Sequence, residues 1–434
     1  MSPKIAVAAF AAAVPAGIFQ SALRVAGRYG LSTFGTMAIA GAHFIAALAF
    51  LRALPPAEFG LVSFAFVAVP PLLSATMSLV AASLLTTMYR EKAVAQSALT
   101  TNLKANLCIS VLVAALLAAL MFAVGAGVAP SLLFGAYGGL MSSRQFARAL
   151  GYIDGRPFAV TASDVTYSAV LLFGLAALFI AHAFSLLAIA GLLAAAAATA
   201  LVPFGRAFLA QMFSAGFTGW LEEYSATFRD LARWSLLGVV STEMTVNAHA
   251  YLVTLIAGPQ SFALLAVGAL FLRPVSLFLT ALPEMERPAM VRGIVNGDMA
   301  EAFRPVKTFR LATAAAWLVT IALTAAVLTW FPGLMLKSHY AAGDVAVVVM
   351  LWAAIMAVRI VRTPDGVLMQ AAAEFKRLAG ASVGSAGVSI VLTLALLLLW
   401  GPIASLGGIL VGELVMMVRL RVLIRDWRRR QWSK

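Results

Sequence analysis

The chain is a succession of apolar runs, each about 20 residues long and bounded by charged residues, Gly or Pro. An α-helix of that length crosses the hydrocarbon core of a bilayer, where only helices and closed barrels satisfy their backbone polar groups. The runs are continuous and do not alternate with polar residues, so they predict helices. Since 62% of the residues are hydrophobic and only 11% are charged, we expect an all-α polytopic membrane protein.

The boundaries of these runs predict twelve transmembrane helices. The expected spans are 30–51, 59–85, 107–124, 128–143, 158–180, 184–204, 235–257, 262–282, 311–331, 345–358, 378–400 and 403–420. The expected divisions are a lead-in (1–29), an N-lobe (30–205), a cytoplasmic linker (206–234), a C-lobe (235–420) and a basic cytoplasmic tail (421–434). The lead-in is apolar but short for a span, and Pro15 favours an interfacial or disordered segment over a cleaved signal peptide.

Basic residues predict the orientation of the chain. With both termini in the cytoplasm, all but three of the 31 Lys and Arg residues fall in cytoplasmic loops and tails, the exceptions being Arg52, Arg273 and Lys337. This bias follows the positive-inside rule and indicates a multi-pass protein of the bacterial inner membrane. It also accounts for the net charge of +14 without a nucleic-acid partner. We interpret the basic tail as a topology anchor, with anionic membrane lipids as the alternative contact.

Several kinds of chemistry have no signature in the sequence. The single Cys108 excludes an intramolecular disulfide, and the four histidines form no HxxxH or HExxH pair, so we predict neither a metal site nor a cofactor. There is no GxxxxGK[ST] phosphate-binding loop. Energy for any transport must then come from a gradient or from the substrate.

The two halves of the chain resemble each other. A shift of 203 positions aligns Ser32 with Ser235, Gly35 with Gly238, Ala47 with Ala250, Pro56 with Pro259, Phe59 with Phe262, Leu61 with Leu264, Pro71 with Pro274 and Leu79 with Leu282. A shift of 218 to 220 relates the fifth and sixth spans to the eleventh and twelfth. Pro71 and Pro274 are expected to kink spans two and eight at the same level and to act as hinges. An even number of spans separates the repeats, so the halves are parallel and predict a rocking transporter.

Three segments carry a family resemblance. They are ALPPAEFGLVSFAFVAVPPLL after the first span, AGPQSFALLAVGALFLRP after the seventh, and WGPIASLGGILVGELVMMVRL near the end. In these segments the chain resembles the Wzx-like oligosaccharide flippases of the multidrug, oligosaccharidyl-lipid and polysaccharide exporter superfamily. The resemblance implies two six-helix lobes around a central cavity that passes undecaprenyl-diphosphate-linked oligosaccharides to the periplasmic leaflet. It also implies polysaccharide assembly proteins as partners.

Two other functions stay open. A multidrug or cation antiporter of the same superfamily would share the fold, although the acidic coupling residue common in its first span is absent here. A membrane ligase or polymerase needs a sizeable outer loop, and the longest outer segment, 332–344, is too short for one. We therefore expect a transporter and not an enzyme.

Charged and polar residues inside spans seven and eight are the main site candidates, because such residues usually face a cavity or a partner. Glu243, Asn247 and His249 lie on span seven and Arg273 on span eight. At about 1.5 Å per residue, Glu243 and Arg273 lie at similar depths, so we expect them to meet. Arg273 would bind the substrate diphosphate while Glu243 holds it between cycles; alternatively, the two form a structural pair.

Further candidates are two residues of the first span. His43 is interpreted either as a proton-responsive group or as a neutral side chain hydrogen-bonded between helices. Arg52 either snorkels to the surface or lines the outer mouth of a diphosphate path. Asp164 and Glu413 are expected to pair with nearby basic loop residues.

Overall fold

A computed structural model describes residues 16–81, 95–206, 233–330, 340–372 and 374–432, together with a few single positions between 208 and 229. The expectations for the first fifteen residues, for most of the linker and for the outer loop carrying Lys337 and His339 lie outside the described residues. Every regular element in the described parts is a helix.

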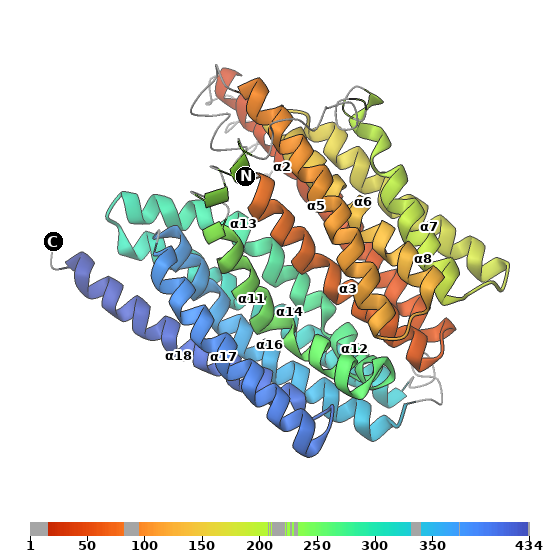
Figure 1. Ribbon diagram of the computed structural model, residues 1–434. Coiled ribbons are helices and arrows are strands. Elements are labelled where there is room, and N and C mark those ends of the chain that lie inside the picture. The colour runs from red at the N-terminus through yellow and green to blue at the C-terminus, as the bar shows by residue number, and fades with distance from the viewer. Residues whose placement is uncertain are drawn as a thin grey trace, which may run out of the picture.

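The first half of the chain forms one group of helices and the second half another. The first half contains α2 (Ala16–Ala53), α3 (Pro56–Thr76), the π-helix η1 (Met77–Ala81), α5 (Ala95–Ala123), α6 (Val128–Ile153), α7 (Pro157–Ile180), α8 (Leu186–Thr199) and the 3-10 turn η2 (Val202–Phe204). The second half contains α11 (Arg233–Ala257), α12 (Pro259–Phe271), α13 (Arg273–Val295), α14 (Met299–Trp330), α16 (Ala342–Ala371), α17 (Phe375–Trp400) and α18 (Ser405–Trp432). The two groups lie side by side (Figure 1).

Each of the twelve expected spans overlaps a described helix or helix pair. Within the described residues, eight helices are long and apolar enough to cross a membrane, and the count rises to nine if the bent pair α12 and α13 forms one span. The remaining helices, α6, α11 and α18, carry Arg, Glu or several Ser and Gly residues in their central turns. An all-α polytopic membrane protein is confirmed, whereas twelve crossings and the cytoplasmic location of both termini stay predictions.

The helices of the two halves begin in matching register. Pro56 opens α3 and Pro259 opens α12, 203 positions later. Proline suits the first helical position, where its missing N–H would have no partner. The first residues of α8 and α18 lie 219 positions apart, the offset that the sequence comparison found near the end. In contrast, α2 begins at Ala16, well before the expected start of span one at residue 30.

The two proline kinks differ. In α12 and α13 the helix axis bends by 65° at Leu272, directly before Arg273 and Pro274. In α3 the helix continues through Pro70 and Pro71 and changes to a π-helix only at Met77. The bend expected at Pro274 is therefore confirmed, whereas α3 has no break in its helix at Pro71. Proline removes one backbone donor in both places, but only the second half breaks its span there.

The halves meet along α3, which packs against α11 and α12. Phe64 of α3 makes edge contacts with Tyr251 and Phe262, with ring centroids 5.5 and 6.3 Å apart. Gly60 allows the close approach, because a Cβ at this position would overlap the carbonyl of Pro259. This contact fixes one end of the interface between the halves.

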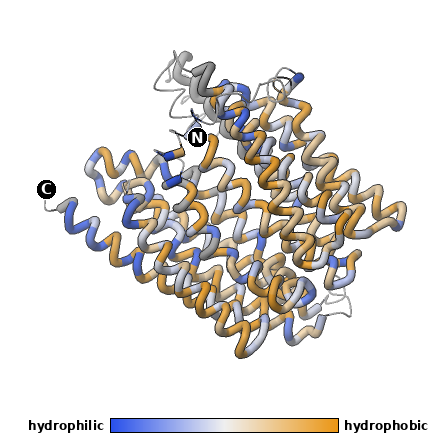
Figure 2. The backbone as a smooth tube through the Cα atoms, viewed as in Figure 1, coloured by the Kyte–Doolittle hydropathy of each residue, from blue (hydrophilic) through white to orange (hydrophobic). Residues whose placement is uncertain are grey.

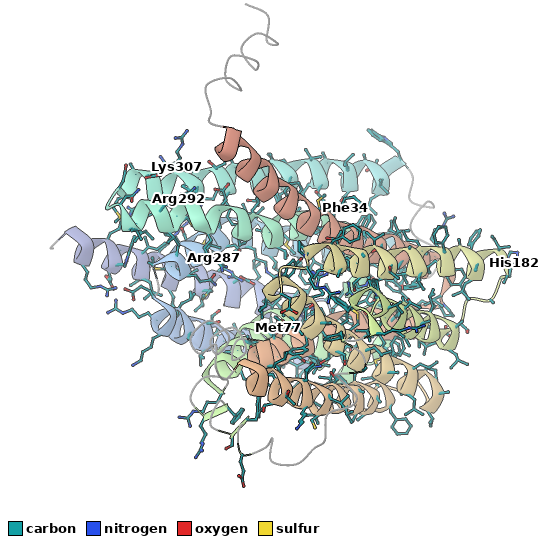
Figure 3. The ribbon with its side chains drawn as sticks, turned by 90° about the horizontal axis from the view of Figure 1, so that it is seen from above. Phe34, Met77, His182, Arg287, Arg292 and Lys307 are labelled. Carbon is teal, nitrogen blue, oxygen red and sulfur yellow. The ribbon has the colours of Figure 1, made fainter. Side chains whose placement is uncertain are left out.

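Apolar residues cover most of the helix surfaces between polar ends (Figure 2). Large apolar side chains such as Phe173 and Leu399 are more than 70% exposed. Water would penalise such a surface, whereas lipid tails solvate it. Viewed from above, the labelled Arg287, Arg292 and Lys307 gather toward one end of the bundle and His182 lies at the other (Figure 3).

Candidate functional site

A polar cluster of the first half borders its interface with the second. His43 on α2 lies with its Nε2 atom 2.7 Å from the hydroxyl of Tyr167 on α7, and that hydroxyl lies 3.3 Å from the hydroxyl of Tyr137 on α6. Phe66 stacks on the His43 ring at a centroid distance of 5.0 Å. Both tyrosines are almost fully buried. The structure therefore gives His43 the interhelical hydrogen bond that was one of its two interpretations.

Arg273 faces this cluster from the second half. It is the first residue of α13 and follows the bend directly. Its guanidinium, partly buried, interacts electrostatically with His43 and Tyr137. In the described part of the chain Arg273 forms no ion pair and no side-chain hydrogen bond. A guanidinium without a counter-charge within an apolar span is unusual, because charges in such places normally have a partner or face a cavity.

The expected pair of Glu243 and Arg273 does not form. The Glu243 carboxylate accepts hydrogen bonds from the Asn247 side-chain amide at 2.9 Å and from the Ser74 hydroxyl at 3.5 Å. Asn247 follows Glu243 by four positions on α11, so the two side chains share a helix face. The bend at Leu272 directs Arg273 toward the first half, while Glu243 contacts Ser74 of α3. The pairing was predicted from the depth of each residue along its helix, and depth alone gives no information about the bend.

His249 lies apart from Arg273 and Glu243. It is 4% exposed and packs within the second half, 5.4 Å from Trp352 and 6.3 Å from Phe262 between ring centroids. Two positions along a helix rotate a side chain by about 200°, so His249 points away from the face that carries Asn247. The structure thus places it in the core of the second half and not with the cavity candidates.

Arg52 is exposed near the end of α2. A cation in the last turn interacts favourably with the helix dipole. No described contact joins Arg52 to the cluster around His43, so the structure separates these two candidates.

An apolar groove adjoins Arg273. Its volume is about 610 Å³, and it lies between α2 of the first half and α12, α13 and α14 of the second. Phe44, the neighbour of His43, and Pro274, the neighbour of Arg273, both line it. The other lining residues are Leu48, Leu51, Leu270, Phe271, Phe278, Ala312, Ala315, Ala316, Val319, Thr320, Leu323, Thr324 and Val327. A cation and an apolar groove are therefore adjacent at the interface between the halves.

Asp164 pairs with arginines, as expected. Its carboxylate, completely buried on α7, accepts hydrogen bonds from Arg144 and Arg148 of α6. The Arg144 Nε–H also donates to the hydroxyl of Ser163 at 3.0 Å. The pairing is confirmed, but these arginines belong to a helix and not to a loop.

Glu413 of α18 has the same kind of environment in the second half. Its completely buried carboxylate accepts hydrogen bonds from Arg359 at 2.8 Å and from Arg362, both on α16. Arg144 and Arg359 lie 215 positions apart, and Arg148 and Arg362 lie 214 apart. The arginines thus come from helices α6 and α16, which correspond in the two halves, whereas the carboxylates come from α7 and α18, which do not. In each cluster two arginines share one carboxylate, so one net positive charge remains, and the ion pairs bind the helices of that half together.

Tyr137 and Tyr167 were missed by the sequence argument. Each interrupts an apolar span with a hydroxyl that needs a partner when buried. A tyrosine hydroxyl inside an apolar span therefore indicates a buried hydrogen bond, and this was the feature of the sequence that could have revealed the two residues. The two tyrosines are partners of each other, and His43, the second partner of Tyr167, lies 124 positions away from it and could not be identified from spacing.

Comparisons with known proteins identify the fold. No protein-family model and no curated protein matches the sequence. Among solved structures, the lipid II flippase MurJ in an inward closed conformation has a TM-score of 0.70 and 13% identity, covering 91% of this chain and 87% of MurJ. An inward-facing MATE multidrug resistance transporter of the MOP superfamily has a TM-score of 0.65 and 12% identity, covering 93% of this chain and 95% of the transporter.

A third similar structure is a MOP superfamily transporter from Pyrococcus furiosus. It has a TM-score of 0.58 and 13% identity and covers 93% of this chain and 94% of that one. At these identities the similarity concerns the fold, over nearly the whole length of each protein. The chain therefore has the fold of the transporters of the MOP superfamily.

Proposed function

We propose that this protein flips undecaprenyl-diphosphate-linked oligosaccharides across the bacterial inner membrane for surface polysaccharide biosynthesis. The observation that carries this proposal is the position of Arg273 and its lack of a counter-charge in the described part of the chain. This residue is a partly buried guanidinium with no counter-charge among the described residues, held between the two halves and beside an apolar groove.

The substrate has two unlike parts, and the site suits both. A diphosphate requires cationic donors, and the planar fork of an arginine can bind two phosphate oxygens at once. A polyprenyl chain requires a long apolar surface, which the groove beside Pro274 supplies. The sugars need dispersed hydrogen-bonding groups, and Glu243 and Asn247 present such groups close to α3.

The multidrug antiporter of the same fold is the second candidate. Glu243 favours it, because a carboxylate with hydrogen bonds but no ion pair in the described residues can exchange a proton or bind a cation. A cationic drug would, however, be repelled by Arg273. The two functions therefore predict opposite effects when this charge is removed.

The test compares Arg273→Gln with Arg292→Gln, which removes the same charge from an exposed position of the same helix. We expect Arg273→Gln to slow transport at least about tenfold, because a hydrogen bond to a charged group contributes about 1.5–3 kcal/mol. Arg273→Lys should retain part of the activity, since it keeps the charge without the fork. Arg292→Gln should match the wild type.

Transport is measured as surface polysaccharide at matched protein levels and as translocation of a diphosphate-linked oligosaccharide in proteoliposomes. Efflux of a cationic dye is measured in parallel. Normal translocation by Arg273→Gln would overturn the diphosphate role. Dye efflux that depends on Glu243, without any oligosaccharide translocation, would assign the antiporter function instead.

A further inference from the structure

A second cavity lies between the start of α14 and the C-terminal parts of α16 and α18. Its volume is about 900 Å³. Six basic side chains line it, and Asp365 is the one acidic residue among the lining residues. The basic residues are Lys307, Arg310, Arg421, Arg425, Arg428 and Arg429.

The positive charge of this cavity is largely uncompensated. Asp365 already forms an ion pair with Arg310 at 2.5 Å. In the part of the chain that the structure describes, Lys307, Arg421 and Arg425 have no ion-pair partner. These cations face one space from two helices, and like charges that converge in this way repel each other unless an anion lies between them.

Packing holds the cavity in shape. The guanidinium of Arg428 lies 3.8 Å from the ring centroid of Phe303 on α14, a cation–π contact. Trp427, 2% exposed, packs in a cluster with Phe309 of α14 and Leu368 of α16. The end of α18 is thereby fixed against its neighbours, so the basic residues are arranged before any ligand arrives.

The depth of the cavity corresponds to the headgroup region of a bilayer. Arg310 directly precedes the apolar stretch 311–330 of α14, and 20 residues of helix extend about 30 Å, the thickness of the hydrocarbon core. Lys307 and Arg310 therefore lie where the phosphates of the leaflet lie. The basic end of the second half is visible beside the C-terminus in Figure 2.

An apolar surface continues from the cavity toward the hydrocarbon. On α18, Leu414 and Val418 precede Arg421 and Arg425 by seven positions, so they share a helix face, and they are 38% and 56% exposed. On α14, Leu311 follows Lys307 by four positions and is 72% exposed. An anion bound to the basic residues would therefore have an apolar protein surface next to it on the side that faces the hydrocarbon.

We propose that this cavity binds the headgroup of an anionic phospholipid of the cytoplasmic leaflet, with its phosphate at Lys307, Arg421 and Arg425 and its acyl chains along Leu311, Leu414 and Val418. The shared chemistry is a phosphate group, which a soluble anion could also supply. The apolar continuation selects the lipid. The basic tail is then part of a lipid site in addition to a topology anchor.

The test uses the purified full-length protein in zwitterionic nanodiscs or micelles, titrated with phosphatidylglycerol. The cavity variant is Arg421→Gln with Arg425→Gln. Its control is Arg292→Gln with Arg304→Gln, which removes two exposed arginines from α13 and α14 at the same end of the protein, outside the cavity lining. A basic residue near an anionic surface contributes about a fivefold gain in lipid affinity, so we expect affinity to fall about thirtyfold in the cavity variant and less than about twofold in the control.

Retained phosphatidylglycerol is quantified by mass spectrometry, and the thermal midpoint is followed at each lipid concentration. Equal losses in both double variants would overturn the proposal, because they would indicate general surface attraction. Displacement of the lipid by inorganic phosphate at equal concentration would overturn it in favour of a soluble anion, and displacement by a polyprenyl diphosphate would assign the cavity to the transported lipid. If the double variant does not elute as a monodisperse species, Lys307→Gln replaces it, with an expected loss of about fivefold.

Discussion

Replacing Glu413 by Gln should destabilise the second half of the chain by about 3 kcal/mol. The carboxylate of Glu413 is completely buried and accepts hydrogen bonds from Arg359 and Arg362. The substitution leaves two cations close together without a counter-charge. Breaking a buried ion pair costs about 3–5 kcal/mol, and we expect the lower end because the arginine side chains are 13% and 18% exposed and keep some hydration.

Asp365→Asn is the matched control on α16. Its partner Arg310 is 38% exposed, so water can solvate the released cation and the cost should be about 1 kcal/mol. Unfolding entropies of about 2.1 cal/mol/K per residue, applied to 434 residues, convert the two losses to decreases in the thermal midpoint of about 3 °C and about 1 °C. The midpoint is measured by size exclusion of the heated, fluorescently tagged protein.

A triple variant separates charge from packing. Glu413→Gln combined with Arg359→Met and Arg362→Met removes every charge of the cluster, and uncharged replacements of a buried ionic cluster are often neutral or stabilising. We expect it to recover most of the lost midpoint. The electrostatic explanation would be refuted by a triple variant less stable than Glu413→Gln alone, or by a Glu413→Gln protein as stable as the wild type.

Two further predictions concern the interface between the halves and the bend. Gly60→Leu should force α3 and α12 apart, because even a Cβ at this position overlaps the Pro259 carbonyl. We expect it to reduce both transport and the thermal midpoint. Gly41→Ala is the control and should change neither, because no atom lies within 4 Å of the new Cβ. Pro274→Ala should slow transport more than Pro71→Ala at matched protein levels, because the 65° bend lies at Pro274 while α3 continues through Pro71. Equal rates in the two proline variants would show that the bend is not a hinge.

The sequence alone determined the helical class, the approximate positions of the helices and the register of the two halves. Hydrophobic length depends on the bilayer and not on tertiary contacts, so it can be read from the residues directly. The ion pairs of Asp164 and Glu413 were also predictable in kind, because a carboxylate inside a span needs a cation.

Tertiary structure alone decided which polar groups meet. Depth along the helices suggested that Glu243 and Arg273 would pair, but a 65° bend turned Arg273 toward His43 and Tyr137. Likewise, the residues at 421–434 predicted a basic tail, while its convergence with Lys307 into one cavity depends on how α14 and α18 pack. Hydropathy and spacing record how far a residue lies along its own helix, and the direction in which it faces its neighbours is fixed by packing between helices.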